Sequence, residues 1–198
     1  MAGDVGLKIS ATLVAALFLI CSLGACHSRG RIIDSGDAGA FALDPDSTWG
    51  VGFTRAKVGE ARSAGSVVLC KKPSERTVTL QSIEPVSITG QVRLDGIGVR
   101  HAFSLGPHQE SDANKYLVGD MRGAPRGLHD PAGFVVDTTC PGRPEPVTEI
   151  VVTMTETGSP GGALEGLRVD YLDGSDLHEL VIHWHFGLCE TGDVQQPC

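Results

Sequence analysis

Short runs of β-branched and aromatic residues, each ended by glycine, proline or aspartate, fill the chain from Trp49 onward. Apolar side chains at every second position are typical of strands with one buried face, and no segment carries an apolar stripe of helical spacing over three turns. The glycine- and proline-rich stretch 119–133 is expected to be a long loop. We therefore expect an all-β fold with strands at 50–58, 66–71, 77–86, 90–94, 134–139, 147–155, 166–172 and 177–188.

The last two segments predict the best-defined element, a β-hairpin. Apolar residues occupy alternate positions on both sides of an Asp-Gly-Ser-Asp turn at 173–176. Because burial of one Leu, Ile or Phe side chain contributes about 1.5–3 kcal/mol, we expect this hairpin to lie at the centre of the core. Its inner face would carry Leu167, Val169, Tyr171, Leu180, Ile182, Trp184 and Phe186.

The number and spacing of the strands predict the architecture. About seven to nine short strands, separated by turns at intervals of about 8–12 residues, are typical of two sheets packed face to face. The general plan is similar to that of immunoglobulin domains, although the spacing of Cys, Trp and Cys found in antibody domains is absent. We expect an immunoglobulin-like two-sheet β-sandwich over residues 49–198.

The first 26 residues predict an export signal. Lys8 precedes an apolar run, 9–20, and small residues then lead to Cys26. The run is shorter than the roughly 20 apolar residues that a membrane-spanning helix needs, so we expect cleavage before Cys26. A secreted protein cut nearby and an uncleaved anchor remain as alternatives.

The four residues Leu23-Gly24-Ala25-Cys26 resemble the lipobox of bacterial lipoproteins. This resemblance implies that the sulfur of Cys26 receives a diacylglyceryl group and that the signal peptide, residues 1–25, is removed. Two acyl chains give stable membrane anchoring, whereas one gives only marginal binding. Residues 26–48 would hold the lipidated cysteine and a flexible tether, because they are rich in Gly, Asp, Ser and Ala.

The chain as a whole resembles the small uncharacterised lipoproteins of high-GC Gram-positive bacteria. The likeness rests on the lipobox and on a strand-rich, cysteine-paired domain. It implies a location on the extracytoplasmic face of the cell membrane, held there by the lipid. The formal net charge of −8 is unchanged by loss of the signal peptide, which contains one acid and one base. An acidic chain of this kind disfavours nucleic acid as a partner, because nucleic-acid binding requires a basic face.

Four cysteines remain after processing, namely Cys70, Cys140, Cys189 and Cys198. An even number in an exported chain predicts two disulfides. Sequence alone leaves three connectivities open; the positions at strand ends favour Cys70–Cys189 with Cys140–Cys198, and Cys189–Cys198 is the local alternative. A zinc-thiolate site is disfavoured, because no C-x₂-C pair occurs.

His183 and His185 are the candidate metal ligands. In a strand, residues i and i+2 point to the same face and lie roughly 6–7 Å apart. Two imidazoles at this spacing could bind Cu or Zn if a third ligand came from a neighbouring segment. Otherwise the pair is simply an ordinary polar part of an exposed strand face. The possible further ligands are His101, His108, His129, His178, Glu179 and Asp170.

No motif for nucleophilic catalysis is readable in the sequence. Ser159 lies among glycines, but the spacing is not the G-x-S-x-G of a nucleophile elbow, and a mobile loop explains it better. Asp170, Asp173 and Asp176 surround a glycine as in a calcium loop. The later acidic ligand of such a loop is out of register, so an aspartate-capped turn is the better interpretation.

These observations favour a membrane-anchored, non-enzymatic lipoprotein without a cofactor, which binds or scaffolds an envelope protein or a small ligand. Trp49 and Tyr116 could form an aromatic platform for a ligand, although single aromatic residues more often pack in a core or at its rim. The alternative function is Cu or Zn binding through His183 and His185. A hydrolase is a third hypothesis, for which the sequence offers no nucleophile and base that can be paired.

Overall fold

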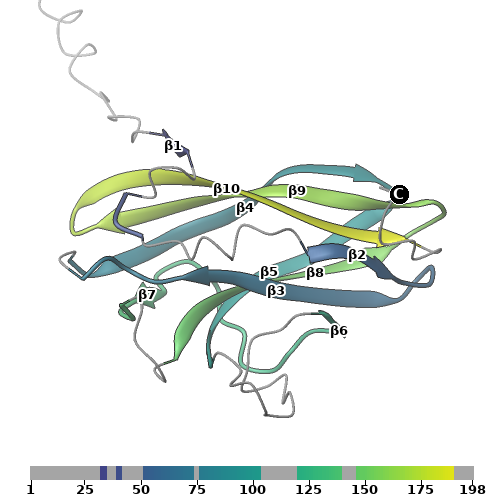
Figure 1. Ribbon diagram of the computed structural model, residues 1–198, viewed down its shortest axis with the longest axis horizontal. Coiled ribbons are helices and arrows are strands. Elements are labelled where there is room, and N and C mark those ends of the chain that lie inside the picture. Colours follow the sequence, from purple (N-terminus) through teal and green to yellow (C-terminus); the bar gives the residue numbers. More distant parts are fainter. Residues whose placement is uncertain are drawn as a thin grey trace, which may run out of the picture.

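The structure, a computed structural model, describes residues 32–34, 39–41, 51–73, 76–103, 120–139 and 146–189. Within these ranges no residue is helical, and the strands form two sheets that pack against each other (Figure 1). The predicted all-β fold and two-sheet β-sandwich are therefore confirmed.

The first sheet is built around the predicted C-terminal hairpin. Its order is β1-β10-β9-β4-β7, and β2 also pairs with β10. The pairs within β10, β9, β4 and β7 are antiparallel, whereas β1 and β2 both run parallel to β10 on its other edge. The strands are β1 (Ile32–Asp34), β2 (Val51–Arg55), β4 (Val78–Gly90), β7 (Val135–Val136), β9 (Gly161–Asp173) and β10 (Asp176–Cys189).

The second sheet has the order β5-β8-β3-β6 and is antiparallel throughout. Every residue of β8 from Thr148 to Glu156 is buried, because both faces of this central strand are covered. Ile150, Val152 and Met154 face the core between the sheets. The strands are β3 (Ala61–Leu69), β5 (Val92–Ala102), β6 (Asp120–Arg122) and β8 (Val147–Glu156).

The hairpin lies in the core, as its alternating pattern predicts. The seven large side chains expected on its inner face are all at most 2% exposed. Tyr171 packs edge-on against Phe41, with ring centroids 4.6 Å apart. Trp184 stacks on Phe186 at 5.8 Å. The turn is also confirmed, because Asp173 pairs with Asp176 in register.

Two expectations about segment boundaries are corrected by the structure. Parts of the predicted tether belong to the fold, since β1 pairs with β10 and Phe41 is fully buried in the core. The predicted loop 119–133 contains β6, which pairs with β3. Both strands have only three residues, too few for a readable alternation of apolar and polar side chains.

Polar pairs occupy the face of the second sheet that is turned away from the core. Ser63 and Thr153 share a hydrogen bond of 2.7 Å. Arg100 and Glu149, which lie directly opposite each other in register, form an ion pair at 2.9 Å and are 2% and 0% exposed. A buried charge without a partner is strongly destabilising, so each of these two groups depends on the other.

Candidate functional site

Gly166 opens a hollow on the surface of the first sheet. It has no side chain and a φ of 75°. The neighbouring strand β10 contains a β-bulge opposite Gly166, so that two residues of β10, His183 and Trp184, pair with this one residue of β9. Bulges of this kind re-aim side chains and are over-represented beside functional sites. The hollow, which we call the histidine hollow, has a volume of about 430 Å³. It is lined by Val86, Ser87, Glu165, Gly166, His183, Trp184 and His185.

The structure brings both predicted histidines to this hollow. His183 is exposed and His185 is half-buried. Glu165, which the sequence analysis did not select, lies directly opposite His185 in register. Two imidazoles and a carboxylate are ligand types that suit Zn. As the described side chains stand, however, no group of three or more His, Cys, Asp or Glu could hold a metal ion, so metal binding stays a prediction.

The further ligands that we expected on β10 have other contacts. The ring of His178 stacks on Tyr171, with centroids 5.3 Å apart. Glu179 forms an ion pair with Arg168 at 3.6 Å. Neither His178 nor Glu179 lines the histidine hollow.

Two other candidate ligands, His101 and His129, lie together on a different part of the molecule. Both rings pack against Phe134, at centroid distances of 5.1 and 5.9 Å. The backbone of His129 exchanges hydrogen bonds of 2.8 and 3.0 Å with Val99 of β5. These histidines therefore line no part of the histidine hollow, and His108 lies outside the described residues.

Ser87, Glu165 and His185 form a row across three strands, but their order does not suit nucleophilic catalysis. In a Ser-His-acid triad the imidazole lies between the hydroxyl and the carboxylate. Here the register puts Glu165 between the serine and the histidine. Ser159 lies in the turn between β8 and β9, where Gln91 Nε2 donates a hydrogen bond of 3.0 Å to its carbonyl oxygen.

The aspartates near the hairpin turn contact the sheet. Asp170 accepts a hydrogen bond of 2.8 Å from Ser82 of β4. Gly174 has a φ of 64°, a left-handed conformation that glycine adopts at no steric cost. The segment 173–176 thus serves as the turn of the hairpin.

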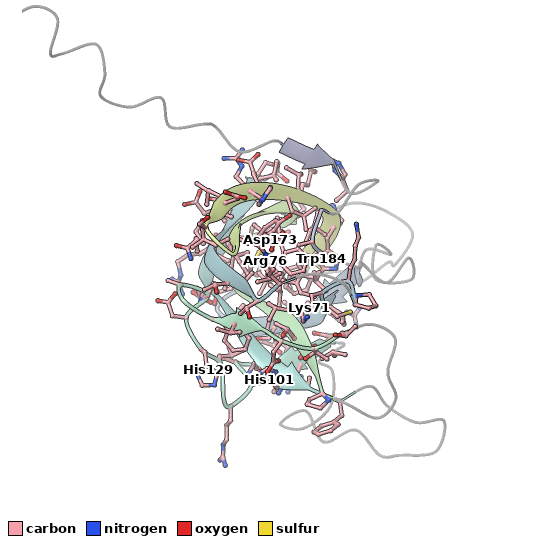
Figure 2. All side chains as sticks on the ribbon, turned by 90° about the vertical axis from the view of Figure 1, so that its left-hand side faces the viewer. Lys71, Arg76, His101, His129, Asp173 and Trp184 are labelled. Atoms are coloured by element: carbon pink, nitrogen blue, oxygen red, sulfur yellow. The ribbon has the colours of Figure 1, made fainter. Side chains whose placement is uncertain are left out.

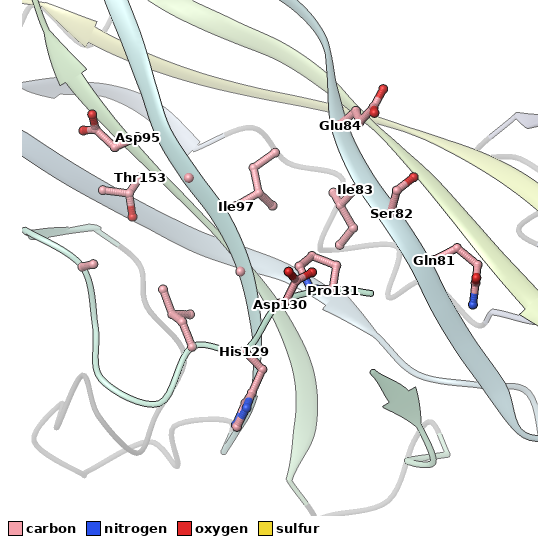
Figure 3. A pocket seen from close by; sticks show the side chains of 14 residues that line it. Gln81, Ser82, Ile83, Glu84, Asp95, Ile97, His129, Asp130, Pro131 and Thr153 are labelled. Carbon is pink, nitrogen blue, oxygen red and sulfur yellow. The ribbon is translucent and has the colours of Figure 1, made fainter. Parts of the chain in front are cut away.

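A second concavity, which we call the edge groove, lies where the two sheets part. β4 and β5 follow each other in the chain but belong to different sheets, so the groove runs between them. Its volume is about 590 Å³. Ile83 of β4 and Ile97 of β5 line its two sides, and Asp130 and Pro131 lie between these strands in Figure 3. Sequence reasoning missed this groove, because it depends on how two sheet edges meet.

Carboxylates give the edge groove its charge. Asp95 accepts hydrogen bonds from Thr155 Oγ1 at 2.5 Å and from Arg93 Nε at 2.8 Å. Burial raises the pKa of Asp95, but these two donors and the charge of Arg93 outweigh burial and hold this pKa below its ordinary value of 3.8. Asp130 accepts a hydrogen bond of 2.8 Å from the backbone N–H of Ala132. The groove thus combines apolar walls with carboxylates that are held in place.

The two cysteines within the described ranges are buried at strand ends. Cys70 directly follows β3 and is 0% exposed, and Cys189 ends β10 and is 4% exposed. Cys140 and Cys198 lie outside the described residues. The pairing of the four cysteines stays a prediction.

The predicted lipidation site, Cys26, also lies outside the described residues, as do Trp49 and Tyr116. In the part of the chain that the structure describes, no helix has the length and apolar character needed to cross a membrane. No protein-family model, no curated protein and no solved structure matches the chain.

Proposed function

We propose that the chain is a lipid-anchored protein of the extracytoplasmic face of the cell membrane, where it binds an envelope protein or a small ligand without catalysing a reaction. The lipobox that ends at Cys26 supports the anchor. The edge groove is the observation that supports binding, because its volume of about 590 Å³ is typical of ligand pockets, roughly 300–1,000 Å³. The net charge of −8 argues against nucleic acid as the partner.

The anchor is tested by replacing the lipidated cysteine. The Cys26→Ala protein should leave the membrane fraction, whereas Cys21→Ala, which changes a cysteine inside the signal peptide, should leave the protein in that fraction. Mass spectrometry of the native N-terminal peptide should show a diacylglyceryl group on Cys26. Unchanged fractionation of Cys26→Ala would exclude the anchor.

Binding in the edge groove is tested by photo-crosslinking in intact cells. A photoreactive amino acid at Ile97, within the groove, should give a discrete adduct. The same amino acid at Leu177, which is 47% exposed and lies outside the groove, should not. Equal adduct yields at the two positions, or no adduct at either position, would contradict binding in the groove.

The histidine hollow favours a second candidate function, the binding of Zn or Cu. His183 and His185 line one hollow together with Glu165, so three groups of the types that bind zinc lie on one surface. Three protein ligands with an open fourth position are a known arrangement for zinc. This function would use side chains that belong to neither the anchor nor the edge groove.

Metal analysis of protein purified without added metal tests this candidate. One Zn or Cu per chain is expected, with loss of the metal in the double variant His183→Ala/His185→Ala. The His178→Ala variant is the matched control, because His178 lies on the same strand but outside the hollow. Absence of metal from the unaltered protein, also after incubation with Zn or Cu and desalting, would rule out this function.

A further inference from the structure

We infer that one end of the sandwich faces the lipid bilayer and that the opposite end points away from it. The bilayer-facing end, which we call the turn end, contains the β9–β10 turn at 173–176 and Arg76, which lies next to Gly174. The opposite end, which we call the far end, contains Gln91 and Ser159. The inference rests on the proposed lipidation of Cys26.

β1 determines where the anchored chain joins the sandwich. It runs parallel to β10, with Ile32 opposite Glu179 and Asp34 opposite Val181. Glu179 is only three residues beyond Asp176, where β10 begins. Because the two strands are parallel, the chain enters β1 from the side of the turn end. Figure 1 shows β1 beside this end of the first sheet.

The segment between the lipid and β1 is too short for the opposite orientation. Ile32 is the sixth residue after Cys26, and six steps along the chain span at most about 22 Å in any conformation. Cys189, at the far end, is the tenth residue after Glu179, and ten steps along a strand cover about 34 Å. A sandwich that stood on its far end would hold Ile32 about 34 Å above the bilayer, beyond the reach of the anchor.

The charges of the turn end do not set this orientation. Lys71, Lys72 and Arg76 contribute positive charge there, and Asp173 and Asp176 contribute negative charge. Figure 2, which looks onto this end, shows Arg76 and Asp173 next to each other. Basic side chains contribute about 1 kcal/mol each at an anionic membrane surface, and the neighbouring carboxylates offset this attraction. We therefore expect the same orientation on neutral and on anionic membranes.

In this orientation the far end stands away from the lipid surface. Val58, which is 58% exposed, lies in the β2–β3 turn at this end, and Ser159 is exposed in the neighbouring β8–β9 turn. These turns would stand farthest from the lipid surface.

Fluorescence quenching on vesicles tests the orientation. Lipidated full-length protein carrying a fluorophore at Ser175→Cys or at Ser159→Cys is reconstituted into phosphatidylcholine vesicles that contain a headgroup-quencher lipid. Both serines are exposed turn residues, and they lie about 40 Å apart along β9. Quenching should be at least about twofold stronger at position 175, because the quencher acts only over distances shorter than this strand. Insertion of a long Gly/Ser segment after Gly30 should abolish the difference.

The outcomes separate this inference from the proposed anchor. Protein that does not bind vesicles, together with an unmodified Cys26, would reject the anchor. Bound protein with equal quenching at the two positions, or with stronger quenching at position 159, would overturn the orientation alone. A difference that survives the Gly/Ser insertion would also overturn it, since the length of the segment would then not be its cause.

Discussion

Gly161 occupies a position that no other residue can fill without strain. It has a φ of 102°, and a Cβ at this position would lie 2.0 Å from the carbonyl oxygen of Leu188 on β10. Real Cβ atoms do not approach backbone oxygens so closely. We predict that Gly161→Ala lowers the free energy of unfolding by about 2–4 kcal/mol, from backbone strain and overpacking together. Urea unfolding followed by tryptophan fluorescence measures this loss.

Gly96 provides the matched control for this substitution. It also lies in a strand, but a Cβ there would meet no atom within 4 Å, and its φ is not in the left-handed region. Gly96→Ala should therefore change the free energy of unfolding by less than about 1 kcal/mol. Equal losses in the two variants would show that the close approach of β9 to β10 does not govern stability here.

Asp95 should make the stability of the sandwich sensitive to acid. Its pKa in the folded state lies below the usual value of 3.8, so the ionised carboxylate stabilises the fold. This contribution is fully present above the unfolded-state pKa and is lost as the pH falls through the folded-state pKa. The Asp95→Asn variant should be less stable than the unaltered protein at pH 7, and this stability difference should shrink as the pH falls below 3.8.

Unfolding measured at several pH values between 7 and 2.5 tests this prediction. Thr155→Val removes the hydroxyl that donates to Asp95. This variant should therefore show part of the stability loss that Asp95→Asn shows at pH 7. Its stability should also depend less on pH in the acid range than that of the unaltered protein. A stability difference between Asp95→Asn and the unaltered protein that stays constant across this pH range would contradict the prediction.

Sequence periodicity accounts for most of the fold but not for the site. The alternation in the last two strands identifies the buried face of the hairpin because the side-chain period of a strand is two. Counting outward from the turn would then place His185 opposite Leu164. The bulge at His183 and Trp184 adds one residue to β10, which moves His185 opposite Glu165 instead.

A bulge changes register without leaving a distinct sequence pattern, and for this reason Glu165 escaped the sequence analysis. Gly166 was the one available signal, since an isolated glycine in a strand often marks a bulge or a close approach of backbones. The edge groove was unreadable for a different reason. It depends on the relative position of β4 and β5, which lie in different sheets, and no local pattern encodes that position.

The elements around the buried cysteines favour one disulfide pairing. Lys71, which follows Cys70, forms a parallel β-bridge with Thr139. The backbone N–H of Lys71 donates a hydrogen bond of 2.9 Å to the carbonyl oxygen of Thr138. Cys140 directly follows Thr139 in the sequence. Because a disulfide requires Cα atoms within roughly 4.4–6.8 Å, the bridge makes Cys140 the favoured partner of Cys70, in place of the Cys70–Cys189 pairing that strand ends alone suggested.

Peptide mapping without reduction checks this pairing. We expect one peptide pair that contains Cys70 and Cys140 and another that contains Cys189 and Cys198. The double variant Cys70→Ala/Cys140→Ala should be less stable by about 2–4 kcal/mol, the usual contribution of one disulfide. A peptide that joins Cys70 to Cys189 would contradict the prediction.

β10 connects both N-terminal segments to the histidine hollow. Its edge pairs with β1 near its start and with β2 near its end, so both N-terminal segments dock on the last strand of the sandwich. The same strand contributes His183 and His185 to the histidine hollow. β1, β2 and the β10 residues of the histidine hollow are therefore parts of one continuous sheet.

The domain accordingly begins well before residue 49, and the contribution of its first segment to stability can be measured. Phe41 is 0% exposed, packs on Tyr171 and lies beside a hydrogen bond of 2.9 Å from Lys72 N–H to the carbonyl oxygen of Ala40. Replacing a buried phenylalanine by alanine costs about 3–5 kcal/mol, so we predict a loss of this size for Phe41→Ala. A chain that begins at residue 49 should lose at least as much relative to a chain that begins at residue 27.

Thermal and urea unfolding checks this prediction. The proteins compared are the chain that begins at residue 27, its Phe41→Ala variant and the chain that begins at residue 49. Val58→Ala serves as the control, because Val58 is 58% exposed and surface substitutions of this kind stay within about 0.5 kcal/mol. If the shortened chain were as stable as the longer one, residues 32–34 and 39–41 would only rest on the sandwich. The sheet would then be complete without β1, and the register between Ile32 and Glu179 would not fix where the N-terminal segment joins the sandwich.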